Sequence, residues 1–251
     1  MKTFLTGTAL ILCISTGAQA QGLTFKSATA TLGYEQFTYS SGTDVFSRSF
    51  STTVDIGIGD KFGVSAAINT HDLSDYPDET YYSATLRPYY VVNSSLEVGA
   101  FVEHNIDKYG AGVTVNTVYG LDFDFVSPTG IAVTGFFGRG QDITETNADF
   151  AGLTVGYGFE NGFDIGAYAK SADVDGSDHI IRSGLTAGYL FSGNVLPVPV
   201  YLSGYIGKQN EGSNSNKTLG MNLTIPIGNA KLGKGQRPSA LSHDAHYEYY
   251  D

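Results

Sequence analysis

The sequence contains one cysteine, no tryptophan and few basic residues. Cys13 lies in an apolar N-terminal stretch that we expect to be removed, so the remaining chain can form no disulfide. This argues against a disulfide-stapled extracellular scaffold. The 14 Lys and Arg residues, against 25 Asp and Glu, form no basic patch or stripe, so no nucleic-acid partner is expected. Beyond the N-terminal stretch, no run is long and apolar enough for a transmembrane helix.

The N-terminus has the pattern of a secretory signal peptide over residues 1–20. An apolar run over residues 4–14 precedes Ala18-Gln19-Ala20, and cleavage is expected after Ala20. The alternative of a lipoprotein signal needs a small residue before Cys13, and Leu12 is too bulky for that position. The sequence therefore predicts export from the cytoplasm.

Alternation of apolar with small or polar residues runs through most of the remaining chain. It is clearest in residues 149–170, where two alternating stretches flank Asn161-Gly162. That pair accepts φ > 0 at both central positions of a tight hairpin. Successive strand residues point to opposite faces, so the same period of two predicts strands at 23–38, 45–58, 61–70, 80–92, 96–106, 109–125, 131–139, 179–191, 200–208 and 217–227 as well.

The apolar faces of these strands recur along the whole chain, and no helical pattern exists to cover them. A closed barrel that turns its apolar side to lipid satisfies both the side chains and the strand edges. Tight turns follow the second, fourth, sixth and eighth strands, and longer polar loops follow the first, third, seventh, ninth and eleventh. The links after the fifth and tenth strands fit this sorting less well, the first being short and the second long. We predict an all-β fold for residues 21–228, a transmembrane antiparallel up-and-down β-barrel of about 12 strands. A secreted β-sandwich or solenoid is the alternative. Residues 229–251 lack the pattern and are predicted to be a flexible tail.

The chain resembles the Gram-negative porin superfamily, in particular the porin-domain proteins of alphaproteobacteria. The shared features are a signal peptide, Gly- and Tyr-rich alternating strands, acidic outer loops and a mature chain without cysteine. The resemblance covers about residues 23–227 and lies in pattern, with no diagnostic site motif. The resemblance implies a channel in the outer membrane for passive diffusion of small hydrophilic solutes or ions. It implies no cofactor, and it makes a homotrimer a possible assembly.

Barrels of this class carry a C-terminal signal for the barrel assembly machinery. The spacing of polar, glycine and hydrophobic residues in that signal matches Thr218, Gly220, Leu223 and Ile225. The chain departs from the family because its members usually end on this strand with an aromatic residue, whereas this chain continues to Asp251. Twelve strands are also fewer than the 16–18 of wide porins, so a narrow pore is expected.

Alternation places Gly, Ser, Thr and Ala, together with scattered charges, on the inner face. Small residues are expected to leave space in the lumen. Five acids belong to the tight-turn ends of their strands, whereas Arg87, Lys170 and Arg182 are expected nearer the middle or the loop ends. Because rings of acids favour cations, we expect a mildly cation-preferring pore with a transverse pairing of charges higher up. Ordinary solvated charges are the alternative. The predicted pore-lining residues are Glu35, Asp55, Arg87, Glu97, Glu103, Asp122, Asp124, Asp164, Lys170 and Arg182.

Other functions have weaker signals. A non-conducting structural or adhesive barrel that acts through its acidic loops is the alternative to a channel. An outer-membrane hydrolase is not expected, because His104 has no serine two residues on and no nucleophile-elbow motif is present. No metal site is predicted: residues 173–178 lack the full spacing of a calcium loop, and the acidic stretch 71–79 and the histidines of the tail are expected to be solvated.

Overall fold

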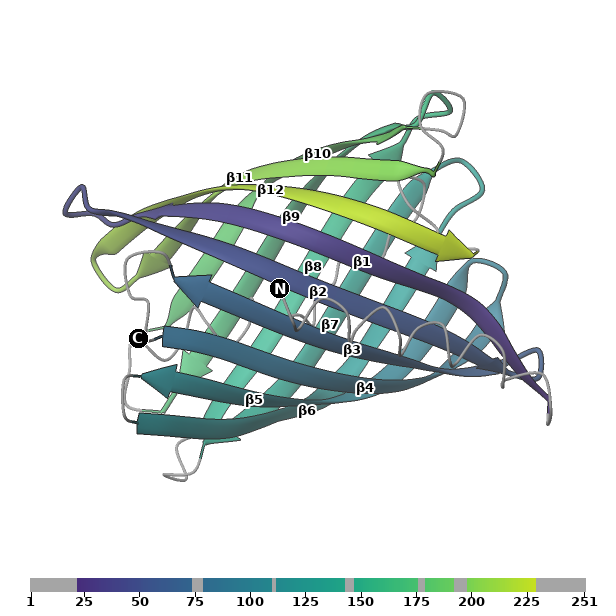
Figure 1. Cartoon of the computed structure of the whole chain (residues 1–251), viewed down its shortest axis with the longest axis horizontal. Helices are drawn as coiled ribbons and strands as arrows, with labels where there is room; N and C mark the ends of the chain where they lie inside the picture. The colour runs from purple at the N-terminus through teal and green to yellow at the C-terminus, as the bar shows by residue number, and fades with distance from the viewer. Residues whose placement is uncertain are drawn as a thin grey trace.

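The first and last strands of the chain pair with each other and close a barrel (Figure 1). The computed structural model describes residues 22–73, 79–109, 112–142, 147–175, 179–191 and 198–228. These residues form twelve strands: β1 (Leu23–Thr38), β2 (Asp44–Ile58), β3 (Phe62–Leu73), β4 (Glu79–Asn93), β5 (Leu96–Tyr109), β6 (Gly112–Val126), β7 (Ile131–Asp142), β8 (Asn147–Gly158), β9 (Phe163–Val174), β10 (Ile180–Phe191), β11 (Val200–Glu211) and β12 (Asn214–Gly228). The prediction of an all-β barrel of about 12 strands is confirmed.

Each strand is antiparallel to the next along the chain, and β1 also pairs with β12. The closing register sets Ala30 opposite Ile225 and Leu32 opposite Leu223. Closure leaves no strand edge with unpaired backbone groups, which is the requirement for a sheet that lies in lipid. Among the described residues, none forms a helix long and apolar enough to cross a membrane.

Large apolar side chains cover the outside of the barrel. Leu86, Phe137 and Leu185 are 49%, 61% and 59% exposed, values that a soluble protein does not repeat over every strand. Leu32 and Ile225 continue the same outer face across the closing pair. The outer surface is therefore suited to contact with acyl chains, as expected from the alternation.

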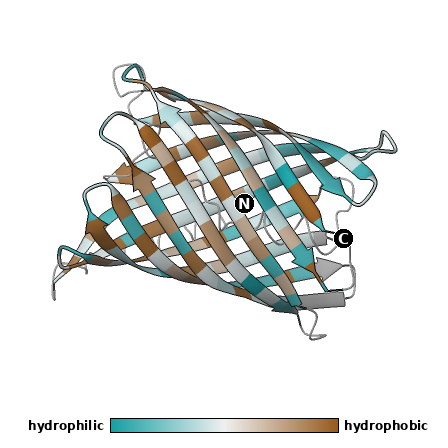
Figure 2. Cartoon of the chain, turned by 180° about the vertical axis from the view of Figure 1, so that it is seen from behind, coloured by the Kyte–Doolittle hydropathy of each residue, from teal (hydrophilic) through white to brown (hydrophobic). Residues whose placement is uncertain are grey.

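The apolar surface is shorter than the strands. The strands have 12 to 16 residues, whereas about ten residues of a tilted strand span a membrane. We call the end with the β2–β3 and β8–β9 connections the turn end, and the opposite end the loop end. Many outward positions near the loop end are polar or charged, and Figure 2 shows hydrophilic residues gathered there and hydrophobic residues toward the turn end. Examples are Arg48, Asp72, Arg139, Lys208 and Lys217.

Several strands extend further toward the loop end than the sequence predicted. The loop expected at 209–216 is only Gly212-Ser213, because β11 and β12 continue to Glu211 and from Asn214. Near the loop end both faces of these strands carry polar residues, so apolar and polar residues no longer alternate although the strands continue. The two exceptions to the sorting of loop lengths are as expected, since β5 and β6 are separated by two residues at the loop end and β10 and β11 by eight at the turn end.

Candidate functional site: the barrel lumen

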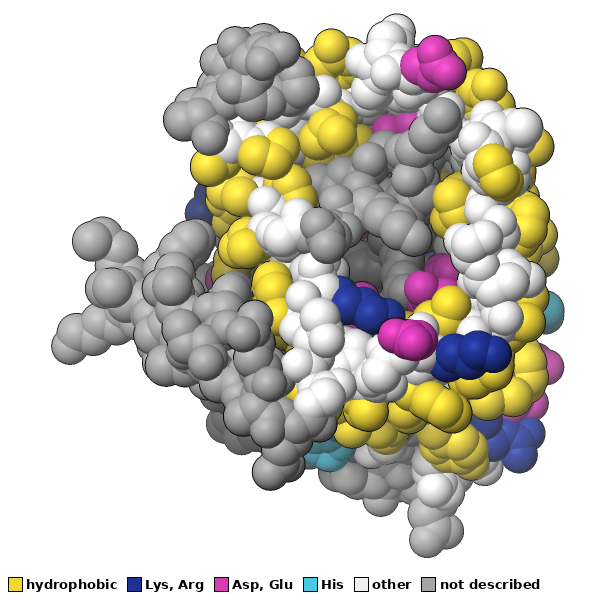
Figure 3. All heavy atoms as spheres, turned by 90° about the vertical axis from the view of Figure 1, so that its right-hand side faces the viewer, with side chains coloured by type: hydrophobic (Ala, Val, Ile, Leu, Met, Phe, Trp, Pro, Cys, Tyr) yellow, Lys and Arg dark blue, Asp and Glu magenta, His cyan; other side chains and the backbone are white. Residues whose placement is uncertain are grey.

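The inner face of the barrel carries the charged residues that alternation assigned to it. Figure 3, a view onto the turn end, shows Lys, Arg, Asp and Glu side chains within a ring of hydrophobic ones. All ten predicted positions alternate with the exposed apolar ones, at Glu35, Asp55, Arg87, Glu97, Glu103, Asp122, Asp124, Asp164, Lys170 and Arg182.

Arg87 of β4 connects two carboxylates of β6. Its Nε donates to both carboxylate oxygens of Asp122 at 2.8 Å, and its Nη2 donates to Asp122 Oδ1 at 2.6 Å and to Asp124 Oδ2 at 2.9 Å. Asp124 also accepts a hydrogen bond of 2.9 Å from Thr134 Oγ1. These charge-assisted hydrogen bonds connect β4, β6 and β7 across the inner surface, although β5 separates β4 from β6 in the sheet.

Tyr89 joins this group to the neighbouring wall. Its hydroxyl donates to Asp55 Oδ1 at 2.7 Å and accepts from Lys26 Nζ at 2.9 Å. The Arg87 guanidinium lies 5.1 Å from the centre of the Tyr89 ring, within the range of a cation–π contact. We call the six residues the turn-end cluster: Lys26, Asp55, Arg87, Tyr89, Asp122 and Asp124.

The structure corrects the expected position of Arg87. The sequence placed it toward the middle or the loop end, apart from the acids. It lies among them because the β4–β5 and β5–β6 registers bring it beside Asp122. The acids of the turn end are thus partly neutralised and do not form an uninterrupted ring. Asp164, on the other side of the lumen, accepts hydrogen bonds of 3.0 and 2.9 Å from Tyr201 OH.

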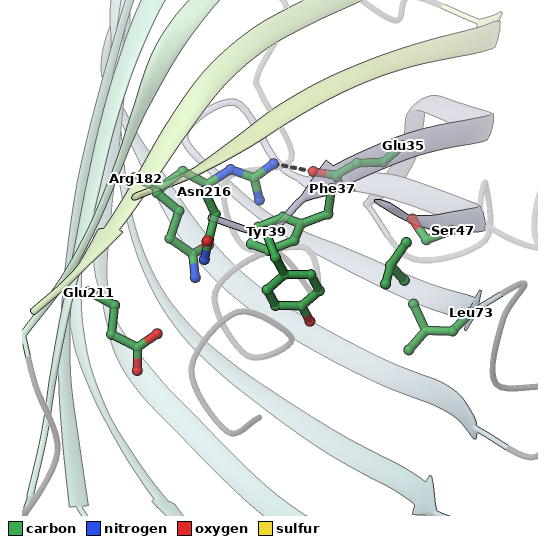
Figure 4. A pocket seen from close by; sticks show the side chains of 10 residues that line it. Glu35, Phe37, Tyr39, Ser47, Leu73, Arg182, Glu211 and Asn216 are labelled. Carbon is green, nitrogen blue, oxygen red and sulfur yellow. Dashed lines mark hydrogen bonds and ion pairs between the residues drawn. The ribbon is translucent and has the colours of Figure 1, made fainter. Parts of the chain in front are cut away.

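Near the loop end, Arg182 of β10 forms an ion pair with Glu35 of β1. Figure 4 shows this pair at the side of a small pocket of about 70 Å³. Because β11 and β12 lie between β10 and β1, the pair crosses part of the lumen, as expected for a transverse pairing of charges. The pocket combines charged, amide and aromatic groups and is lined by Glu35, Phe37, Tyr39, Val45, Ser47, Leu73, Arg182, Gln209, Glu211 and Asn216.

The inner glycines do not simply leave empty space, which corrects a second expectation. A Cβ atom added to Gly63 would overlap the Tyr89 ring, and one added to Gly220 would overlap the ring of Tyr205. In both cases the aromatic residue is directly opposite the glycine on the neighbouring strand. Each glycine therefore allows a large ring to lie against the wall. Phe101 at Gly120, Phe136 at Gly152 and Tyr168 at Gly184 repeat this directly opposite arrangement on the inner face, and the rings of Phe150 and Tyr201 reach Gly140 and Gly188 diagonally.

The lumen has an apolar sector as well as a polar one. Strands β5 to β10 contribute a connected group of buried residues that includes Phe101, Phe136 and Phe150. On the other side, Asn69 Nδ2 donates to Ser83 Oγ at 2.8 Å, and the inner positions of β1, β2 and β12 are rich in Ser, Thr and Asn, with a smaller apolar group of Val45, Leu73 and Tyr81 near the loop end. A solute in the lumen would therefore meet different surfaces on its two sides. The alternation pattern did not reveal this difference, because the inward aromatic residues lie among glycines in the sequence.

Among the side chains that the structure describes, three further charges of the inner face were missed by the sequence analysis. Lys26 turns inward because the register shifts by one residue between Phe25 and Ser27. Asp107 and Glu211 belong to strand ends that were expected to be loops. The pairing between neighbouring strands shows which way such side chains face. The sequence pattern alone does not, because a bulge exchanges inward and outward positions for the residues on one side of it.

The remaining candidate residues divide between described and undescribed parts of the chain. Thr218 and Gly220 face inward and Leu223 and Ile225 face outward on β12, and their role as an assembly signal stays a prediction. His71 faces inward, with its ring centre 6.1 Å from that of Tyr81. Within the described ranges, no three His, Cys, Asp or Glu residues are grouped so that they could hold a metal ion. The signal peptide with its cleavage site at Ala20, most of the two acidic loops and the tail with its histidines lie outside the described residues.

Comparison with known proteins identifies the fold. No protein-family model and no curated protein sequence matches the chain. An outer membrane channel from Pseudomonas putida F1 is similar over 83% of this chain and 97% of its own, with a TM-score of 0.56 and 12% identity. The NanC porin (TM-score 0.52, 9% identity, 77% of this chain and 98% of its own) and the KdgM porin in complex with disordered oligogalacturonate (TM-score 0.50, 10% identity, 76% and 97%) are also similar. At these identities the likeness shows a shared barrel fold.

Proposed function

We propose that this protein is a porin-like channel of the Gram-negative outer membrane that allows small hydrophilic solutes or ions to diffuse passively. The observation that carries the proposal is the division between the two faces of the closed barrel. Apolar side chains such as Leu86 and Leu185 cover the outside, and charged or hydrogen-bonding side chains cover much of the inside. The described fold is also that of proteins named as outer membrane channels and porins.

The charges of the inner face favour cations. Among the described side chains, nine acids (Glu35, Asp55, Glu97, Glu103, Asp107, Asp122, Asp124, Asp164 and Glu211) face four bases (Lys26, Arg87, Lys170 and Arg182), a difference of −5. A negative lumen raises the local concentration of cations. The preference is mild because two of the four bases form ion pairs with three of the acids.

The termini complete the proposal. Residues 1–20 direct export and are cleaved after Ala20, and residues 229–251 form a tail beyond the barrel. The assembly machinery recognises β12 through Thr218, Gly220, Leu223 and Ile225. The porin resemblance allows a homotrimer, and chemical crosslinking of the protein in lipid would measure the number of subunits.

Planar-bilayer recording of the refolded protein tests the channel and its selectivity together. We expect discrete conductance steps and, under a KCl gradient, a reversal potential with the sign of K⁺ preference. Asp164→Asn should reduce the preference, because it removes a lumen charge while the hydroxyl of Tyr201 keeps an acceptor. Glu160→Gln, in the exposed turn of the same hairpin, is the matched control and should change nothing.

The possible outcomes separate the candidate functions. Chloride preference would contradict the selectivity part of the proposal and leave the channel in place. If the folded protein in lipid shows no conductance, the channel proposal is wrong, and the alternative of a structural or adhesive barrel acting through its loops is favoured.

A further inference from the structure

The outer wall of the barrel has an open groove of about 860 Å³ near the loop end, over β9 to β12 and β1. Gly184 of β10 and Gly207 of β11, which lie opposite each other, are part of its floor. Leu185, Ile206 and Leu219 supply its apolar walls, and these three residues are 59%, 56% and 52% exposed. The groove therefore faces outward, where the barrel would meet lipid.

Two lysines form the loop-end rim of this groove. Lys208 of β11 is directly opposite Lys217 of β12, and both side chains are exposed. Neither has a hydrogen bond or ion pair with any of the described residues. Like charges at opposite positions of neighbouring strands destabilise a sheet, so an anion placed between them would be stabilising.

Within the described ranges, the carboxylates that face the outside near the lysines are separated from them by at least one strand. Lys217 pairs with Thr38 of β1, and Asp44 follows only on β2, where its Oδ1 accepts a hydrogen bond of 2.7 Å from Thr38 Oγ1. On the other side, Lys208 pairs with Ser183 of β10. The lysine pair thus forms a local positive site on a chain whose net charge is −11.

We propose that the groove binds a phosphate-bearing anionic lipid from the surrounding membrane. Its phosphate lies between Lys208 and Lys217, and an acyl chain lies along Leu185, Ile206 and Leu219. The lysines stand where the apolar surface of the barrel ends, which is the level of lipid headgroups. This binding is independent of conduction, because the groove is outside the lumen, so it holds whether or not the barrel passes solutes.

The absence of tryptophan from the chain permits a direct test by fluorescence quenching. Leu185→Trp places a single reporter in the groove, and Phe137→Trp is a matched control on β7. Each position is the seventh residue from the turn end of a 12-residue strand and faces outward, with 59% and 61% exposure. The cation beside Phe137, Arg139, already has an ion pair with Asp149 at 2.7 Å.

Each variant is refolded into phosphatidylcholine vesicles that contain brominated phosphatidylglycerol or, separately, the same mole fraction of brominated phosphatidylcholine. For Leu185→Trp we expect the quenching constant with the anionic lipid to exceed that with the neutral lipid about threefold or more. The ratio for Phe137→Trp should be close to one. Adding Lys208→Gln and Lys217→Gln to Leu185→Trp should return its ratio to that of the control.

Equal ratios at the two positions would overturn the proposal, as would a ratio at Leu185 that survives removal of both lysines. Leu219→Trp is a second reporter on the opposite wall of the groove, and it should give the same result if Leu185→Trp does not refold. Folding is checked for every variant by its far-UV circular dichroism and by the shift of its gel mobility on heating. Since no step measures conductance, failure here leaves the channel proposal untouched.

Discussion

Gly63→Ala should destabilise the barrel, although it adds only one methyl group. The Cβ atom would overlap the Tyr89 ring, and even the ring atom Cε1 would lie at 2.7 Å. Tyr89 must therefore tilt into the lumen, and overpacking of this kind costs about 1–3 kcal/mol. The tilt also weakens the 2.7 Å hydrogen bond to Asp55, and hydrogen bonds to charged groups contribute about 1.5–3 kcal/mol. If part of that hydrogen bond survives, the total loss in the free energy of unfolding is about 2–4 kcal/mol.

Urea unfolding in lipid vesicles, followed by far-UV circular dichroism, measures this loss in the free energy of unfolding. Gly204→Ala of β11 is the control, because the nearest heavy atom to its added Cβ is Gly220 O at an ordinary 3.4 Å. It should be neutral or slightly stabilising, since glycine within a strand is about 0.5–1 kcal/mol less favourable than alanine. In a Tyr89→Leu background, Gly63→Ala should lose most of its effect. Equal unfolding free energies for Gly63→Ala and Gly204→Ala would refute the role assigned to the glycine.

Two further perturbations test the two faces of the barrel. Arg87→Gln leaves Asp122 and Asp124 without their cation and should cost about 3–5 kcal/mol of unfolding free energy. The triple variant that also carries Asp122→Asn and Asp124→Asn should recover part of that loss. An Arg87→Gln barrel as stable as the parent would contradict the pairing. Leu121→Lys on the outer face should cost about 2–4 kcal/mol in vesicles. Thr53→Lys on the inner face should leave stability nearly unchanged and move the reversal potential toward chloride, whereas equal costs at the two positions would show that the faces are assigned wrongly.

The outer face could be predicted from the sequence because one physical cause dominates it. Leu219, Met221, Leu223 and Ile225 alternate with small or polar residues on β12, and lipid is the environment that suits such a row on every strand of a closed barrel. The same signal weakens toward the loop end, where both faces of a strand meet water. There the strands had to be found from their pairing, as for Glu211 opposite Asn214.

The contacts within the lumen depend on residues that are far apart in the sequence. Alternation predicted that Arg87 and Asp122 face inward, but no local pattern relates positions on strands separated by a third strand. The single-residue shift at Phe25 likewise inverted the face assigned to Lys26. The roles of the glycines were also hidden, since a glycine that seats a ring and one that lines open space have the same sequence signal.

The ion pairs and hydrogen bonds between lumen residues also determine how strongly the negative charge of the lumen can favour cations. Asp122 and Asp124 share one guanidinium, so together with Arg87 they contribute a single net negative charge at the turn end. Asp55 and Asp164 each accept a hydrogen bond from a tyrosine hydroxyl, which holds the carboxylate in place without neutralising it. A count of acids alone therefore overstates the field that an ion in the lumen would meet. Because Asp55 and Asp164 are held without full neutralisation, they should affect cation preference more per charge than Asp122, which explains the choice of Asp164→Asn for the selectivity experiment.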